Sequence, residues 1–404
     1  MPNARRSYNW DNATVEGSSC PIVALPACVP PPPAWSGGDR LLLATRVEHT
    51  AVALRSLARD HDMPLHRLTR GLFELRGENL GAFVDAAADT LSSVEADEVH
   101  VLAAGSDLDG ADLLAVAMTS PSLRVAKARA DHADLLPLFA DEDTAFHAVY
   151  QPIVDLSAGT VVGHEALLRA THPEAGAPIL PAALFGAAHA AGWTHVLDRV
   201  GRTTALRLAR SWLGDDLLFI NFVPSSIYRP EVCLKTTERA ADEAGLRLDQ
   251  LVFEVTEGHL VRDVEHLTRV FDYYRSRGCR VALDDLGAGY SSLNLLVSLQ
   301  PDIVKLDREV VQALPGPVAT SVVSAVVDIC HAYGGLVLAE CVETQDQAEA
   351  ARALGVDLGQ GWHFGRPVRR AAQRSLPEQA RTIDPALPDA AVALSPDPAA
   401  ASPR

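Results

Sequence analysis

The feature that most constrains the fold of this chain is a regular alternation of β-rich runs and longer helical patterns between residues 149 and 360. The runs are short, rich in Val, Ile, Leu and Phe, and bounded by turn signals. They cover residues 149–156, 161–168, 217–223, 251–257, 280–285, 302–307, 336–343 and 356–360. Such alternation is typical of an α/β architecture, and this number of repeats predicts a closed (β/α)8 TIM-like barrel.

The first two runs depart from the parallel pattern. Only Ser157, Ala158, Gly159 and Thr160 join them, and a right-handed crossover between parallel strands needs a dozen or more residues. An antiparallel hairpin is therefore expected, so that the first barrel strand runs opposite to the others.

Composition and periodicity divide the rest of the chain. A run of four prolines and few charges near the start predicts disorder, and so does the Ala-, Pro- and Asp-rich end. Between the leader and the barrel, strand-like runs at 41–45 and 99–103 and helical patterns at 51–59 and 80–91 predict a small α/β domain, which is expected to regulate the barrel. The expected segments are a Pro-rich leader at 1–38, the small α/β domain at 39–143, the barrel at 144–370 and a disordered tail at 371–404.

The charge of the chain limits its partners. The 404 residues include 52 acidic and 35 basic side chains, which gives a formal net charge of −17. A DNA or RNA polymer is held by a broad basic surface, so this composition argues against such a partner. A small anionic ligand held by metal ions remains allowed.

Other features indicate a cytoplasmic location. The six cysteines lack CxxC spacing and are expected to be reduced thiols, with Cys20 and Cys28 idle rather than metal-binding. Arg5 and Arg6 are followed by polar residues, unlike the start of a secretory signal. No run has the roughly 18 uninterrupted apolar residues of a membrane helix, so membrane insertion is not expected.

Polar side chains recur at or near the end of one β-rich run after another. They are Glu165, Asn221, Glu254, Asp284, Asp285, Lys305, Glu340 and Gln360. Because the carboxyl ends of barrel strands share one rim, where barrel enzymes hold their active sites, these side chains are expected to converge.

Carboxylates crowded in this way repel one another and raise each other's pKa unless a positive charge lies among them. Divalent cations would provide it, and oxygen ligands without Cys or His favour Mg²⁺ or Mn²⁺ over Zn²⁺. The adjacent Asp284 and Asp285 suggest a carboxylate shared between two ions. Two neighbouring ions are a recurrent arrangement for phosphodiester hydrolysis, in which they hold the attacking water and the leaving oxygen.

These residues also resemble a known family. The sequence from His164 to Arg169, HEALLR, resembles the motif of the EAL-domain cyclic di-GMP phosphodiesterases. Further matches follow in the family's order: Asn221 in FINFVPSSI, Glu254 and Glu257 in FEVTE, Asp284 and Asp285 in DDLGAGYSSL, Lys305 in VKLD, Glu340 and Glu343 in AECVE, and Gln360 in QGWHFGRP. The resemblance extends from about Phe146 to Val368, and its specificity comes from the agreement of these separated elements.

The resemblance implies a homodimeric bacterial signalling enzyme that hydrolyses cyclic di-GMP to linear pGpG with two Mg²⁺ or Mn²⁺ ions. The implied metal ligands are Glu165, Asn221, Glu254, Asp284, Asp285 and Glu340, and the implied catalytic residues are Lys305, Glu340 and Glu257. Lys305 would hold the water and offset charge in the transition state, and Glu257 would steady the loop after the aspartate pair. Arg169, Gln360 and Glu343 are the implied substrate contacts.

Three departures from the family pattern keep an alternative open. Leu286 and Ala288 replace an aromatic residue and a hydroxyl, Cys341 replaces a glycine, and Trp362 replaces a tyrosine. The cysteine at 341 is tolerable in place of glycine if the backbone there has φ below zero. The alternative, which Leu286 and Ala288 motivate, is a weak or inactive EAL domain that acts as a cyclic di-GMP receptor; a protein-interaction scaffold is a third possibility.

Overall fold

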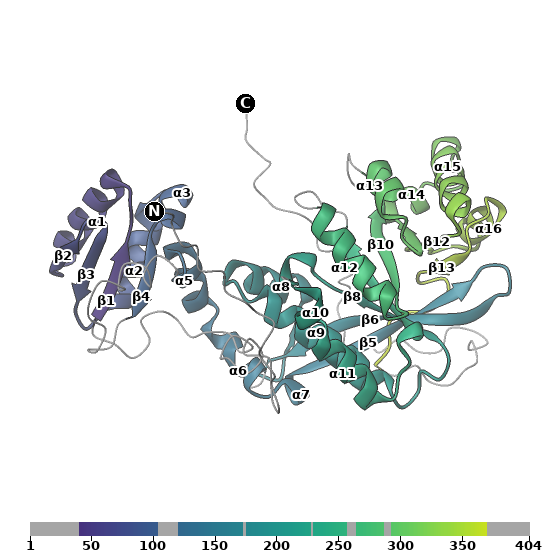
Figure 1. Cartoon of the computed structure of the whole chain (residues 1–404), viewed down its shortest axis with the longest axis horizontal. Helices are drawn as coiled ribbons and strands as arrows, with labels where there is room; N and C mark the ends of the chain where they lie inside the picture. Colours follow the sequence, from purple (N-terminus) through teal and green to yellow (C-terminus); the bar gives the residue numbers. More distant parts are fainter. Residues whose placement is uncertain are drawn as a thin grey trace, which may run out of the picture.

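The computed structural model describes residues 40–103, 120–172, 175–227, 229–256, 264–286 and 292–369. The predicted leader at 1–38 and tail at 371–404 lie outside these ranges. The described strands form a four-stranded sheet and a nine-stranded sheet (Figure 1). None of the described helices is both long enough and apolar enough to cross a membrane.

The nine-stranded sheet closes into the predicted barrel of eight strands. These are β5 (Phe146–Asp155), β6 (Thr160–Thr171), β8 (Leu217–Asn221), β9 (Leu251–Thr256), β10 (Arg280–Leu286), β11 (Ile303–Leu306), β12 (Leu336–Ala339) and β13 (Leu358–Gln360). Closure comes from β5, which pairs with β13 on one side and with β6 on the other. The two-residue β7 (Pro178–Ile179) adds to the end of β6. Every strand predicted for the barrel from the sequence is present.

Strand β5 is antiparallel to both of its neighbours, whereas the other barrel pairings are parallel. The turn that reverses the chain is closed by Asp155, whose Oδ1 accepts hydrogen bonds from the backbone N–H groups of Ser157 and Ala158, both at 2.8 Å. Gly159 has a φ of 67°, which a residue without a side chain adopts readily. The hairpin places Gln151 opposite Glu165 and His147 opposite Arg169.

Helices cover the outside of the barrel (Figure 1). They are α8 (Pro181–Ala190), α9 (Thr194–Ala209), α10 (Pro230–Cys233), α11 (Lys235–Ala244), α12 (Val264–Ser276), α13 (Ser292–Leu299), α14 (Arg308–Gln312), α15 (Pro317–Tyr333) and α16 (Gln345–Ala353), with 3-10 turns η3 (Pro224–Ser226) and η4 (Leu248–Gln250). Local signals explain several ends: Thr344 and Gln347 form a capping box at the start of α16. The longest helix, α15, ends at the left-handed Gly334.

Inside the barrel, an apolar layer lies directly beneath the polar rim. It is made of Ile153, Phe219, Val252, Ala282, Ile303, Leu338 and Leu358. Side chains two residues apart on a strand point to the same face. The position two residues further along β8 to β13 is therefore also internal, and it is polar on every one of these strands: Asn221, Glu254, Asp284, Lys305, Glu340 and Gln360. The apolar layer is the floor of the site.

Truncating this floor is expected to destabilise the fold. Phe219 is fully buried, so Phe219→Ala should lower the free energy of unfolding by about 3–5 kcal/mol, as phenylalanine truncations in packed cores do. Urea denaturation measures this. Val318→Ala is the control, because Val318, on α15, is 77% exposed and its truncation should change stability by less than about 0.5 kcal/mol. Equal midpoints for the two variants would contradict the assignment of a packed floor.

The residues before the barrel form their own antiparallel sheet in the order β2-β3-β1-β4. Its strands are β1 (Arg40–Ala44), β2 (Leu65–Thr69), β3 (Leu72–Arg76) and β4 (His100–Ala103), and its helices are α1 (Glu48–Asp60), α2 (Leu80–Thr90) and α3 (Ser93–Glu98). A separate apolar cluster built around Leu43, Phe83 and Val101 fills this part of the chain. The patterns at 41–45, 51–59, 80–91 and 99–103 correspond to β1, α1, α2 and β4.

A helical segment joins the small sheet to the barrel. It consists of α5 (Leu123–Asp131), η2 (Ala133–Leu135), α6 (Leu136–Ala140) and α7 (Glu142–Ala145). Leu138 and Phe139 pack with Phe146 and Trp193 in one apolar cluster. Glu142 receives two hydrogen bonds from Arg199 of α9, at 2.6 and 3.1 Å. The segment therefore packs on the barrel itself.

Candidate metal centre

The polar residues predicted from strand ends meet at the carboxyl-terminal rim of the barrel. Lys305, in β11, lies at their centre and is only 1% exposed. Its Nζ atom lies 2.6 Å from Glu340 Oε1, 3.0 Å from Glu254 Oε1, 3.1 Å from Asp284 Oδ1 and 3.9 Å from Glu165 Oε1. Burial alone would lower the pKa of Lys305, but the surrounding carboxylates outweigh it and hold the pKa well above its ordinary value. Lys305 is therefore a permanent cation at the centre of the site.

A second part of the site is a set of amides around Glu165. Asn221 Nδ2 donates a hydrogen bond to Glu165 Oε1 at 3.0 Å, and Gln360 Nε2 donates one to Glu165 Oε2 at 2.7 Å. Gln360 also donates to Gln151 Oε1 at 3.3 Å, and Gln151 in turn donates to the carbonyl of Gly365 at 3.2 Å. Gln151 was not predicted from the sequence. Its position could have predicted it: Gln151 lies two residues before the floor residue Ile153, and because β5 runs in the reverse direction, that places it on the rim side of the floor.

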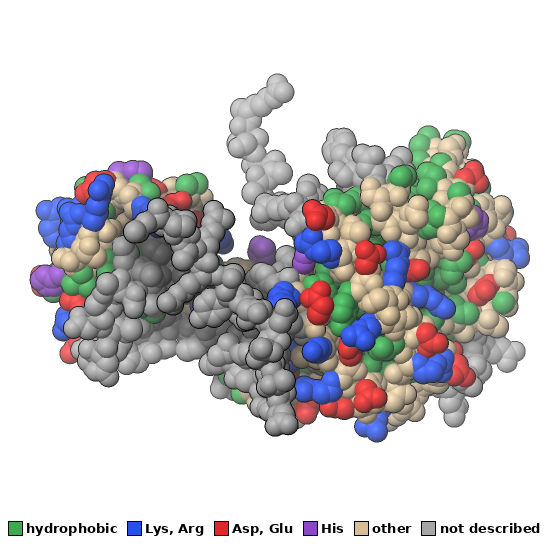
Figure 2. Space-filling view, viewed as in Figure 1, with side chains coloured by type: hydrophobic (Ala, Val, Ile, Leu, Met, Phe, Trp, Pro, Cys, Tyr) green, Lys and Arg blue, Asp and Glu red, His purple; other side chains and the backbone are tan. Residues whose placement is uncertain are grey.

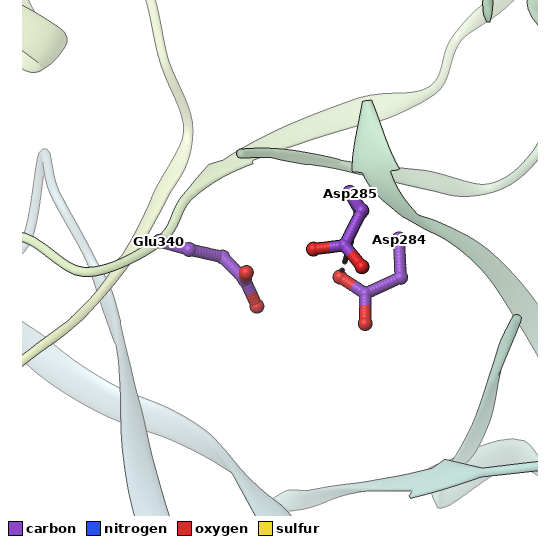
Figure 3. A group of neighbouring side chains, drawn as sticks. All are labelled: Asp284, Asp285 and Glu340. Atoms are coloured by element: carbon purple, nitrogen blue, oxygen red, sulfur yellow. Dashed lines mark hydrogen bonds between the residues drawn. The ribbon is translucent and has the colours of Figure 1, made fainter. Parts of the chain in front are cut away.

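Three carboxylates form the cluster drawn in Figure 3. Asp284, Asp285 and Glu340 each offer an oxygen within 4.8 Å of the others, and Glu340 extends towards the aspartate pair from the opposite side. Asp285 has a φ of 59°, and its N–H donates to Asp284 Oδ1 at 3.0 Å. Burial, together with the charge of Asp284, raises the pKa of Asp285 to about 6. Adjacent side chains of a regular strand point to opposite faces, whereas the left-handed conformation of Asp285 allows its side chain and that of Asp284 to lie in the same cluster.

The donor set fits divalent cations. Glu254 is fully buried, and apart from the ion pair between its Oε1 and Lys305, its carboxylate has no partner among the described residues. Burial raises the pKa of Glu254 well above its ordinary value; the charge of Lys305 opposes this, and Glu165 and Asp284 add to it. A single lysine does not balance so many buried carboxylates, whereas oxygen-rich sites of this kind are what Mg²⁺ and Mn²⁺ prefer.

Not every predicted site residue joins this cluster. Arg169 lies four residues beyond Glu165 on the same face of β6, and its guanidinium donates to the carbonyl of Leu168 at 2.9 Å. Glu343 is exposed and contacts α14, where Gln312 Nε2 donates to it at 3.1 Å and Arg308 lies 3.5 Å away. Glu257 lies outside the described residues.

The condition under which Cys341 would replace glycine without strain is not met: its φ is 52°, in the left-handed region. The cause is the turn that follows Glu340. There Val342 N–H donates to the Gln360 carbonyl at 2.9 Å, and a Cβ atom on the adjacent Gly361 would lie 2.1 Å from the Val342 carbonyl oxygen. The loops that follow β12 and β13 are thus held against each other, and Cys341 accepts a conformation that costs a residue other than glycine about 1–2 kcal/mol. Cys341 and the other described cysteines, Cys233, Cys279 and Cys330, are free thiols; Cys20 and Cys28 lie outside the described residues.

Comparison with known proteins agrees with this fold. The EAL domain family model matches residues 134–367, more than half of the chain, and the chain belongs to this family. Two cyclic di-GMP phosphodiesterases of Pseudomonas aeruginosa are similar to it. One is 35% identical over 242 residues, which are 59% of this chain and 40% of that protein. The other, RocR, is 32% identical over 251 residues, which are 58% of this chain and 61% of RocR. The chain thus matches less than two thirds of the length of either relative.

Two solved structures resemble the barrel. An EAL protein of Vibrio cholerae O395, in its c-di-GMP bound form, has a TM-score of 0.50 and 32% identity; the match covers 56% of this chain and 93% of that one. The PaMucR phosphodiesterase in complex with c-di-GMP has a TM-score of 0.51 and 29% identity, and the match covers 58% of this chain and 98% of that one.

Proposed function

We propose that this chain hydrolyses cyclic di-GMP to linear pGpG in a reaction that requires two Mg²⁺ or Mn²⁺ ions. The observation that carries the proposal is the buried Lys305 surrounded by Glu165, Glu254, Asp284 and Glu340 at the rim of an EAL barrel. Retention of every predicted metal ligand and of the central cation favours turnover over binding alone. The product would lower the level of a bacterial second messenger.

The residues divide between two ion positions. Glu165, Asn221, Glu254 and Asp284 would hold one ion, and Asp284, Asp285 and Glu340 the other. Together the ions would lower the pKa of the attacking water and offset negative charge on the phosphodiester. In this proposal Asp284 is a ligand of both ions. Its central position supports this role, since its carboxylate contacts both Lys305 and the backbone N–H of Asp285.

The side chains of the chain itself would position water and substrate. Lys305 is placed to donate to the attacking water and to offset charge that develops on the phosphoryl oxygens, while Glu340, 2.6 Å away, fixes the ammonium group. Arg169, beyond Glu165 on β6, would contact a phosphate or another part of the substrate, as would Gln360 and Glu343. Glu257 would steady the loop after Asp285.

We further propose that residues 39–143 form a regulatory domain and that the protein is a homodimer. The separate apolar cluster of the small sheet supports the first proposal. The apolar α13, which follows the aspartate pair, supports the second. Light scattering over a range of concentrations tests the dimer, and a constant monomeric mass would contradict it.

No broad basic surface is seen among the described side chains on the face shown in Figure 2, where acidic and basic groups are interspersed.

The test of the main proposal is hydrolysis of cyclic di-GMP by purified protein with Mg²⁺ or Mn²⁺, beside a Glu165→Ala variant. We expect linear pGpG from the wild type and at most trace product from the variant, since Glu165 is a metal ligand and the acceptor for both Asn221 and Gln360. A chelator should abolish the wild-type reaction. Intact substrate after incubation with wild-type protein, under conditions where another EAL phosphodiesterase works, would contradict the proposal.

A second candidate function is a cyclic di-GMP receptor without turnover. The left-handed Cys341 beside Glu340 and the buried Leu286 after the aspartate pair favour it, because each is an unusual residue for the family directly beside a proposed metal ligand. Tight binding of cyclic di-GMP in the presence of a chelator, without hydrolysis when metal is restored, would support the receptor. Rapid hydrolysis would exclude it.

A further inference from the structure

Outside the metal centre, the barrel contains a buried ion pair that the proposed reaction does not use. Asp198 and Arg202 lie one turn apart on α9 and are 6% and 3% exposed. Removing two charges from water carries a desolvation cost that the attraction between them often fails to repay. Contacts to other parts of the fold can offset this cost.

The two side chains connect α9 to the loop after β8 and to α11. Asp198 Oδ1 accepts a hydrogen bond from the backbone N–H of Val223 at 2.7 Å, and Oδ2 accepts one from Arg202. Arg202 Nε donates to Thr237 Oγ1 on α11 at 3.0 Å. Each carboxylate oxygen of Asp198 thus has its own donor, and Arg202 fixes the direction in which the carboxylate points.

The backbone that Asp198 holds is the one that carries Asn221. The next three residues are each held from a different element: Phe222 N–H donates to the Glu254 carbonyl of β9 at 3.0 Å, Val223 N–H donates to Asp198 of α9, and the Pro224 carbonyl contacts His266 Nε2 of α12 at 3.2 Å. Of these three contacts, only the one from Asp198 is made by a carboxylate. Asn221 is the last residue of β8, and its Nδ2 donates to Glu165. The position of the backbone at this strand end therefore determines where the amide lies relative to Glu165.

We propose that Asp198, fixed by Arg202, is a positioning residue for the metal centre: it sets the backbone after β8 so that Asn221 can act as a ligand. The inference rests on the proposed function in taking Asn221 as a metal ligand. Without the carboxylate, the buried N–H of Val223 loses its acceptor, and the backbone shifts to find another. Partners that orient metal ligands typically change metal affinity by about 10–100-fold when they are removed.

The test is Mn²⁺ binding by the full chain, followed through the electron paramagnetic resonance signal of free Mn²⁺ and hence independent of turnover. The main variant is Asp198→Leu with Arg202→Leu, which removes the acceptor without leaving a buried charge unpaired. We expect Mn²⁺ affinity to fall by about tenfold or more while the circular dichroism spectrum stays that of the wild type. Asp198→Ser with Arg202→Gln is a second double variant, with polar side chains in place of leucine. The Mn²⁺ affinity of whichever double variant folds tests the proposal.

Two single variants separate positioning from general damage. Asp198→Asn keeps an oxygen for Val223 N–H, so its Mn²⁺ affinity should lie closer to wild type than to the double variants, even if it melts at a lower temperature. Arg199→Gln is the matched control: Arg199 lies on α9 next to Asp198, and the substitution breaks its ion pair with Glu142 of α7 and should leave Mn²⁺ affinity unchanged.

The outcomes are distinct. Wild-type affinity in a folded double variant would overturn the positioning role, and so would an Asp198→Asn variant that binds as weakly as the double variants. Wild-type protein that binds Mn²⁺ but leaves cyclic di-GMP intact would instead refute the proposed hydrolysis, while the affinities of the variants would still decide the role of Asp198.

Discussion

Lys305→Met is expected to lower kcat for cyclic di-GMP by about 10²–10³-fold, the usual effect of removing a donor that stabilises charge in the transition state. Methionine nearly preserves the buried volume and removes the ammonium that contacts Glu254, Asp284 and Glu340. Steady-state kinetics at saturating Mn²⁺ measure the effect, and the loss should fall mainly on kcat, because Lys305 acts on the attacking water and on charge that develops during the reaction.

The control for Lys305 is Arg239→Gln, which removes a cation on α11 whose side chain is 70% exposed and pairs with Glu243. This substitution should leave kcat close to the wild-type value. A Lys305→Met variant that hydrolyses cyclic di-GMP at the wild-type rate would remove the central assumption of the mechanism.

The second large effect is expected for Asp284→Asn, which should weaken Mn²⁺ binding by at least about 100-fold, since even residues that only orient a ligand can reach that figure. Asp284 is the carboxylate assigned to both ions, and it contacts Lys305 at 3.1 Å. The amide keeps the shape of the side chain and removes its negative charge. Isothermal titration calorimetry with Mn²⁺ measures the change directly.

Asp302→Asn provides the same substitution at the other end of the barrel. Asp302 accepts a hydrogen bond from Val281 N–H at 2.9 Å and pairs with Arg275, far from the rim that holds the cluster. It should alter thermal stability and leave Mn²⁺ affinity unchanged. Similar losses of affinity in the two variants would show that Asp284 acts through folding rather than as a ligand.

The barrel and most of its site were predictable because both follow from strand periodicity. Ile303 and Lys305 illustrate this, since the inward face of one short strand supplies a floor residue and then a site residue. The β2–β3 hairpin was missed because His66, Arg67 and Glu74 interrupt any alternation of apolar and polar residues. Its register follows instead from pairing with β1.

Two features of the site depend on contacts that no sequence pattern reports. The φ of Cys341 is set by the hydrogen bond between Val342 and Gln360, residues 18 positions apart in a chain that returns to the rim. The role inferred for Asp198 depends on its contact with Val223, which lies outside α9. From sequence alone, a charged residue on a helix is expected to be exposed to solvent.

The reversed direction of β5 also determines where neighbouring parts of the chain attach. Phe146, where β5 begins, pairs with Ala170 near the end of β6, and Val368 pairs with Tyr150 after β13 has ended. In a barrel with only parallel strands the first strand would begin at the face opposite the active site. Here the polypeptide enters and leaves the barrel on the side that holds the carboxylate cluster. A domain attached to either end of the barrel is therefore tethered beside the proposed metal centre, within reach of it without a long linker.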